Sequence, residues 1–233
     1  MLVKLMTRRW QMRYFFSLLF VGLSACDALS PNWEDLIETG YNAYQDGRYE
    51  EAEGLLLEAL RRSNDFPETD LRRVTTLTTL AELYLVQSRQ QDTETLYRQA
   101  LTILEQTLDG NDFRLTVHLI KMAEFYLERN ILSEAESLYE RAVLILERDR
   151  GEMDIDLAIA RAGLADTYYQ NGFFSEAEPL LQQSLAVLTN QLDPNNAVLA
   201  NLMAVYAELL RATDRGREAA NLEARVRAIE TSP

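Results

Sequence analysis

The sequence predicts an all-α fold, a solenoid of about five antiparallel helix pairs that spans residues 33–230. The first observation is a segment that returns every 42 residues, with an alanine at the same place in four copies: Ala81, Ala123, Ala165 and Ala207. The second is composition, because the 233 residues include only 9 Gly and 5 Pro and many good helix formers. One helix pair cannot bury its apolar face alone, so repeats of this kind must stack.

Each copy contains two apolar stripes at helical spacing, which predicts two helices per copy. The third copy shows both stripes, with Leu119, Met122, Ala123 and Tyr126 in the first and Ala135, Tyr139, Ala142, Val143 and Leu146 in the second. An earlier copy begins at Gly40. Ser133 and Glu136 have the spacing of a capping box, so we expect Ser133 to cap the second helix, and Ser175 to do so in the fourth copy.

The first 25 residues have the three parts of a secretory signal peptide. Four basic residues and no acidic one precede an apolar run over 14–23, and two small residues, Ser24 and Ala25, follow it. A run of about 10 apolar residues is roughly half of what a membrane-spanning helix needs. We therefore expect residues 1–25 to be removed on export. An ordinary signal peptide, or an uncleaved anchor with an incidental cysteine, is the alternative.

Cys26 is the only cysteine of the chain and directly follows this segment. The stretch Leu23-Ser24-Ala25-Cys26 resembles the lipobox of bacterial lipoproteins. The resemblance implies a diacylglycerol on the thiol of Cys26, cleavage before it, and a lipidated N-terminus with a short tether over 26–32. Several acyl chains hold a protein durably on a membrane. The implied location is the cell membrane, by a lipid anchor, on the extracytoplasmic (periplasmic) side.

The charge of the chain excludes some partners. Without residues 1–25, which hold four of the 23 basic residues, 19 basic and 37 acidic residues remain, a net charge of −18. Nucleic acid is excluded as a partner, because binding it relies on Lys and Arg at the phosphates. General attraction of the whole body to anionic headgroups is excluded for the same reason.

The repeats resemble the tetratricopeptide repeat (TPR) over residues 33–230. The period of 42, with the stretches "EAEPLLQQSLAVL" and "LDPNNAVLA", is similar to the subtype of kinesin light chains and their bacterial relatives. That subtype often has two asparagines before the alanine, whereas Thr78-Thr79, Ile120-Lys121 and Ala162-Gly163 stand there in this chain. Ligand chemistry that depends on those asparagines is therefore not expected.

The resemblance also implies a concave groove, lined by the first helix of each pair. Counting from the repeated alanine as the eighth position, the ninth positions are Glu82, Glu124, Asp166 and Glu208, and the twelfth include Tyr44, Leu85, Leu127 and Tyr169. We expect an acidic row beside an apolar and aromatic floor, suited to a cationic or amphipathic segment of another protein. The alternative is that these acids form an ordinary solvated face.

No residues for catalysis stand out. His118 is the only histidine, which excludes a His-based metal cluster or triad, and the glycines are isolated. We expect no enzyme activity, no metal, no cofactor apart from the lipid on Cys26, and no small-molecule substrate. The sequence thus predicts a membrane-anchored, non-enzymatic TPR adaptor. A structural subunit of an envelope or pilus assembly complex, and a regulator of a cell-wall enzyme, remain as alternatives.

Overall fold

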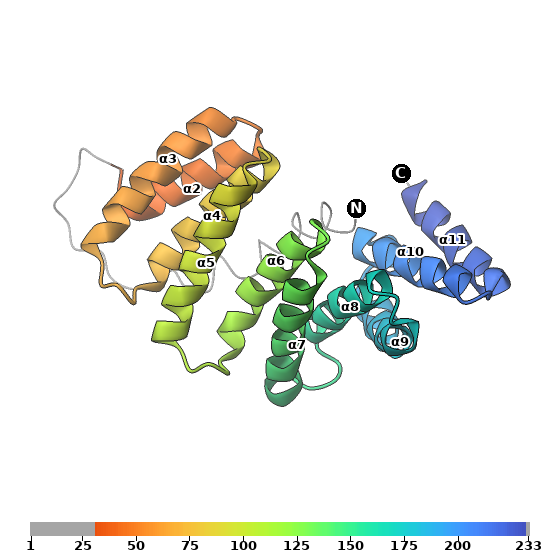
Figure 1. Cartoon of the computed structure of the whole chain (residues 1–233). Helices are drawn as coiled ribbons and strands as arrows, with labels where there is room; N and C mark the ends of the chain where they lie inside the picture. The colour runs from red at the N-terminus through yellow and green to blue at the C-terminus, as the bar shows by residue number, and fades with distance from the viewer. Residues whose placement is uncertain (1–30, 232–233) are drawn as a thin grey trace. The chain divides into compact units, whose positions relative to one another are not determined.

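A computed structural model describes residues 31–231 (Figure 1). Within this range the chain forms ten α-helices and two short 3-10 helices, and no strand. The described residues divide into two compact units, which we call the N-terminal unit (31–118) and the C-terminal unit (119–231). The prediction of an all-α fold built from helix pairs is confirmed. The predicted signal peptide (1–25) and Cys26 lie outside the described residues.

The N-terminal unit is a stack of two helix pairs. Its α-helices are α2 (Trp33–Gln45), α3 (Tyr49–Arg62), α4 (Leu71–Val86) and α5 (Gln90–Thr107), with 3-10 turns at Ser63–Asp65 (η1) and Phe113–Leu115 (η2). Each helix packs against the next, and α2 also contacts α4, so first helices lie beside first helices (Figure 1). Fully buried leucines fill the space between them, among them Leu56, Leu77, Leu80 and Leu83.

The C-terminal unit continues the same pattern. Its helices are α6 (Thr116–Leu127), whose first three residues belong to the N-terminal unit, α7 (Leu132–Asp149), α8 (Ile155–Gln170), α9 (Phe174–Gln191), α10 (Ala197–Ala212) and α11 (Gly216–Glu230). α8 packs against α7, α9 and α10, and α10 packs against α9 and α11. Its core includes Leu157, Leu181, Leu188 and Leu209, none of which has exposed surface.

The first helix of each pair starts at a side-chain cap. The capping residues are Asn32, Asp70, Asp112, Asp154 and Asn196, where Asp112 caps η2 just ahead of α6. The carboxylate of Asp154, for example, accepts from the backbone N–H groups of Asp156 at 2.9 Å and Leu157 at 3.1 Å. Such caps satisfy N–H groups that have no partner inside the helix. They therefore fix where each repeat begins.

The second helix of each pair starts differently, and here the prediction of serine caps was wrong. The N-cap residues of α7 and α9 are Ile131 and Phe173, with no side-chain cap. The chain enters these helices through a left-handed residue at each turn: Gly47, Ser88, Asn130, Gly172 and Asp214. The turn closes by backbone bonds, such as Phe173 N–H to the Tyr168 carbonyl at 2.8 Å. The helix has thus already begun at Ser133 and Ser175, whose hydroxyls bond neighbouring glutamates instead.

Adjacent repeats are also joined by polar contacts that recur in both units. In the N-terminal unit, Glu53 of α3 accepts from the hydroxyl of Tyr84 at 2.9 Å and from Arg89 at 2.6 Å. In the C-terminal unit, Glu178 of α9 accepts from Tyr206 and Arg215 in the same way. Because each glutamate bridges a tyrosine and an arginine of the next pair, these contacts fix the register between pairs.

Candidate functional site

The four predicted acids lie at the same register of four successive first helices. Glu82 is on α4, Glu124 on α6, Asp166 on α8 and Glu208 on α10. Glu208 is exposed, but Glu82, Glu124 and Asp166 are only 6–8% exposed. The repeat pattern gave their register, whereas their burial is new information from the structure. Buried carboxylates are costly unless something compensates them, so their surroundings decide what they can do.

In the N-terminal unit, Glu82 lies near an aromatic surface. Burial raises the pKa of Tyr41 on α2, and the charge of Glu82 raises it further. The ring of Tyr44 lies 6.2 Å from that of Tyr41 and 6.3 Å from that of Tyr49, measured between centroids. Tyr44 and Leu85 are both partly exposed. On this unit Glu82 thus lies near a cluster of three tyrosines, of which Tyr44 is partly exposed.

In the C-terminal unit, Asp166, Tyr169 and Glu208 form one group. Burial raises the pKa of Asp166, the hydrogen bond from Gln170 at 3.0 Å lowers it, and the charge of Glu208 raises it again, which leaves it above its usual value. Burial also raises the pKa of Tyr169, with further contributions from Glu208 and Asp166 and from its hydrogen bond to Glu208. The charge of Glu208 on α10 thus acts on the carboxyl group of Asp166 on α8. Neither forms an ion pair with any residue between 31 and 231.

Tyr139 of α7 connects this group to Glu124. Tyr139 is 2% exposed, and burial raises its pKa well above the usual value, with the charges of Glu124 and Asp166 adding to the effect. Its ring lies against Gly163 of α8. Of the predicted floor residues, Tyr169 is partly exposed and packs 5.8 Å from Phe174, while Leu127 is buried. Of the predicted residues on this unit, Glu208 is exposed and Tyr169 is partly exposed, whereas Glu124, Asp166 and Leu127 are buried.

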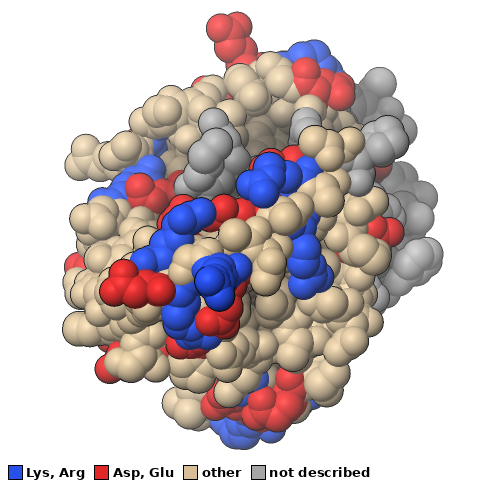
Figure 2. Space-filling view, turned by 90° about the vertical axis from the view of Figure 1, so that its right-hand side faces the viewer, with Lys and Arg blue, Asp and Glu red and all other residues tan. Residues whose placement is uncertain are grey.

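Acidic and basic side chains mix elsewhere on the surface. Figure 2 shows one face on which Lys and Arg alternate with Asp and Glu in mixed clusters. The ion pairs of α10 and α11 have the same character, since Arg211 pairs with Glu223, and Arg215 pairs with Glu178 and Glu218. Each arginine offsets the charge of one acid, so the negative net charge comes from the acids in excess of such pairs. The group of Asp166 and Glu208 differs because Asp166 is buried and neither acid has an ion pair among the described residues.

Metal-binding groups and membrane-spanning helices are both absent from the described part of the chain. Residues 31–231 contain no group of three or more His, Cys, Asp or Glu side chains that could hold a metal ion. Of the helices in this range, none combines the length and the apolar character needed to cross a bilayer.

Sequence reasoning missed one feature, a pocket lined by arginines at the start of α2. The adjacent pairs Arg61-Arg62 and Arg72-Arg73 were its only sequence signal.

The chain belongs to the tetratricopeptide repeat family, whose family model matches residues 39–106, 113–189 and 156–231. Repeats of this family are generally non-enzymatic protein-interaction modules. No curated protein matches the chain in sequence.

Solved structures show the same fold. BtubC (BKLC) from P. vanneervenii is 21% identical with a TM-score of 0.74, over 84% of this chain and 79% of that one. A putative kinesin light chain from Podosopora anserina, with nearly identical TPR-like repeats, is 23% identical with a TM-score of 0.69, over 84% and 94%. PilF of Pseudomonas aeruginosa is 18% identical with a TM-score of 0.62, over 86% and 78%. The similarity to kinesin-light-chain-like repeats agrees with the 42-residue period.

Proposed function

We propose that this protein is a membrane-anchored, non-enzymatic adaptor that holds a cationic or amphipathic segment of a partner protein against its first helices. A lipid on Cys26 would place it on the extracytoplasmic side of the cell membrane, and no other cofactor is needed. The repeats supply a preformed surface, and the partner is held by contacts with that surface.

The group of Asp166, Tyr169 and Glu208 is the observation that carries this proposal. Burial and the neighbouring Glu208 raise the pKa of Asp166, so the ionised form of Asp166 is disfavoured. A Lys or Arg side chain from a partner would remove the repulsion between the two carboxylates. The partly exposed ring of Tyr169 would pack against the apolar part of that side chain. Such charge complementarity favours specificity more than affinity.

The first experiment compares partner capture by three forms of the protein from detergent-solubilised native membranes. The test variant carries Asp166→Asn and Glu208→Gln, which remove charge without adding bulk at a buried position. The control variant carries Glu50→Gln and Glu134→Gln, two exposed acids on the second helices α3 and α7. We expect a copurifying protein to be lost from the test variant by at least about tenfold and retained by the control. Circular dichroism verifies that all three are folded.

If the test variant retains the partner, the partner binds another surface of the protein. Leu144 of α7 is 66% exposed and Met153 in the following loop is 59% exposed. They are the two most exposed large apolar side chains of the described residues, and their burial in an interface would favour the second candidate, a structural subunit of an envelope or pilus assembly complex. In that case the partner survives in the Asp166→Asn, Glu208→Gln variant and is lost when Leu144 and Met153 are both changed to Gln.

A further inference from the structure

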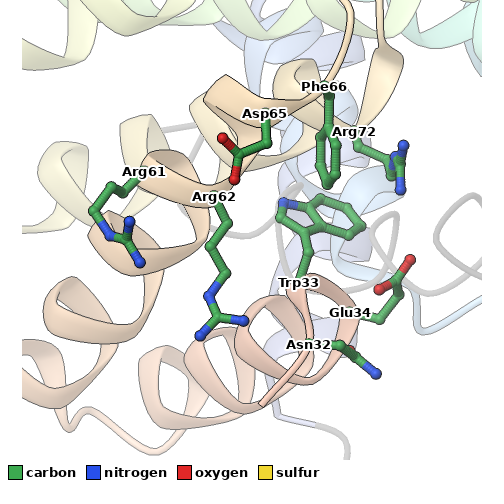
Figure 3. A pocket seen from close by; sticks show the side chains of 8 residues that line it. All are labelled: Asn32, Trp33, Glu34, Arg61, Arg62, Asp65, Phe66 and Arg72. Atoms are coloured by element: carbon green, nitrogen blue, oxygen red, sulfur yellow. The ribbon is translucent and has the colours of Figure 1, made fainter. Parts of the chain in front are cut away.

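An open pocket of about 370 Å³ lies where the described chain enters the N-terminal unit (Figure 3). The start of α2, the end of α3, η1 and the start of α4 form its walls, with Asn32, Trp33, Arg61, Arg62, Phe66 and Arg72 among the lining side chains. We propose that this pocket binds the phosphate of an anionic lipid headgroup in the membrane to which the chain is tethered. This inference rests on the proposed lipid anchor at Cys26.

The donors for such a phosphate come from Arg62. Arg61 donates two hydrogen bonds to Glu58, each 2.7 Å, and Arg62 donates one from Nε at 2.9 Å to the same carboxylate. The side chain of Arg62 is 26% exposed. Its two terminal amino groups have no hydrogen-bond partner among residues 31–231. Because two guanidinium groups share the Glu58 carboxylate, the terminal amino groups of Arg62 are available to an anion, and the planar fork suits phosphate oxygens.

The other walls of the pocket are fixed by their own contacts. The indole N–H of Trp33 donates to the hydroxyl of Thr76 at 3.0 Å, and its ring packs edge-on against Phe66 at 6.2 Å. Arg72 stacks on Phe66 at 3.6 Å and is paired with Asp70, so it forms a wall and not a free donor. The aromatic rings give the pocket a rigid apolar wall beside Arg62.

Two acids at the same pocket limit what can bind. Glu34 and Asp65 also line it, and both repel an anion. Because the repulsion grows with the charge of the anion, they disfavour a singly charged phosphodiester less than a doubly charged phosphate. They also make the interaction weak and sensitive to salt. The negative net charge of the whole chain acts in the same direction. Binding therefore depends on a high local concentration of phosphate next to the pocket.

The tether would supply that concentration. Asn32 caps α2, lines the pocket and is the sixth residue after Cys26. Six residues span at most about 20 Å when fully extended. A lipid on Cys26 would keep the pocket within that distance of the bilayer, where headgroup phosphates are abundant and their effective concentration is high. Occupation of the pocket would then fix the orientation of the N-terminal unit on the membrane.

Trp33 provides a direct measurement, because the chain has only two tryptophans and Trp33 lines the pocket. In a Trp10→Phe background, the full chain in uncharged detergent is titrated with short-chain phosphatidylglycerol, short-chain phosphatidylcholine and inorganic phosphate at constant ionic strength. We expect a saturable fluorescence change with phosphatidylglycerol, and about tenfold weaker binding after Arg62→Gln. Arg73→Gln is the matched control, since it removes the same charge from a half-buried arginine that does not line the pocket.

Two outcomes overturn the inference. A response to inorganic phosphate without one to phosphatidylglycerol would show a phosphate site that does not take headgroups. No saturable response, or equal weakening by Arg62→Gln and Arg73→Gln, would show that the pocket binds no phosphate. The titration does not require a lipid on Cys26. A negative result therefore contradicts phosphate binding by the pocket and leaves the proposed lipid anchor unaffected.

Discussion

Gly163 and Tyr139 show how single residues set the contact between α7 and α8. Tyr139 is fully buried, and a Cβ added at Gly163 would lie 2.3 Å from two atoms of its ring. Real Cβ atoms do not approach other atoms so closely, so the tyrosine and the glycine depend on each other. At the same position the other copies have Glu38, Thr79, Lys121 and Val205. The fourth copy therefore uses glycine to admit a large ring between two helices.

We expect Gly163→Ala to destabilise the protein by about 1–3 kcal/mol, because overpacking a full core outweighs the better helix propensity of alanine. Gly54→Ala is the matched control, since Gly54 also lies within a helix but has open space around its Cβ direction. The control should stabilise the fold by up to about 1 kcal/mol. Urea unfolding followed by circular dichroism measures both. Equal effects of the two changes would contradict the packing argument.

For the acids of the candidate site, the sequence predicted the register but not the burial. The register of Glu82, Glu124, Asp166 and Glu208 followed from the repeat, because equivalent positions of stacked helices face the same way. Their burial did not follow, since it depends on how closely neighbouring helices pack and on residues such as Tyr139 that come from other helices. Sequence indicated which side chains share a face but not which of them reach water.

At the scale of elements, the two helices of a pair begin by different rules. First helices start at an Asn or Asp cap, and second helices start after a left-handed residue in a tight turn. The serines of the second helices had suggested caps, but a local motif cannot show that the backbone turn two residues earlier already fixes the start of the helix. The turn determines where the second helix begins, because backbone hydrogen bonds close the turn without a side-chain cap.

This difference predicts unequal effects of two similar substitutions. Asp154→Ala removes the cap of α8 and should cost about 1 kcal/mol, because two backbone N–H groups lose their partner. Ser175→Ala in α9 should change stability by less than about 0.5 kcal/mol, because its hydroxyl caps nothing. Thermal unfolding of both variants tests the assignment. A larger loss from Ser175→Ala would restore serine as the cap of the second helix.

At the scale of the whole molecule, the proposed function depends on where the chain is held. Cys26 lies outside the described residues, and the described helices offer no span of their own. In the proposed function the anchor would be the lipid on Cys26, and the short tether over 26–32 would join it to the repeats. A solenoid on so short a tether would present its repeats to partners close to the membrane surface.

Mass spectrometry of the N-terminal peptide from the membrane-bound protein tests the anchor. We expect a peptide that begins at residue 26 and carries a diacylglycerol. Cys26→Ser should abolish the lipid and leave residues 1–25 attached, because the thiol is the attachment atom. Ser24→Ala, which keeps a small residue in the lipobox, should be processed normally. An unlipidated peptide, or one that begins elsewhere, would favour an ordinary signal peptide.

The sequence by itself determined the helix pairs, their 42-residue period and the register of the acidic positions. These features are local or periodic, since helical spacing and repeated small residues act within one repeat and between neighbours. The tertiary structure alone decided that Asp166 is buried beside Glu208 and that Tyr139 occupies the space above Gly163. It also placed Arg61 and Arg62 beside Trp33 in one pocket. Burial and proximity depend on residues distant in sequence, which no repeat pattern specifies.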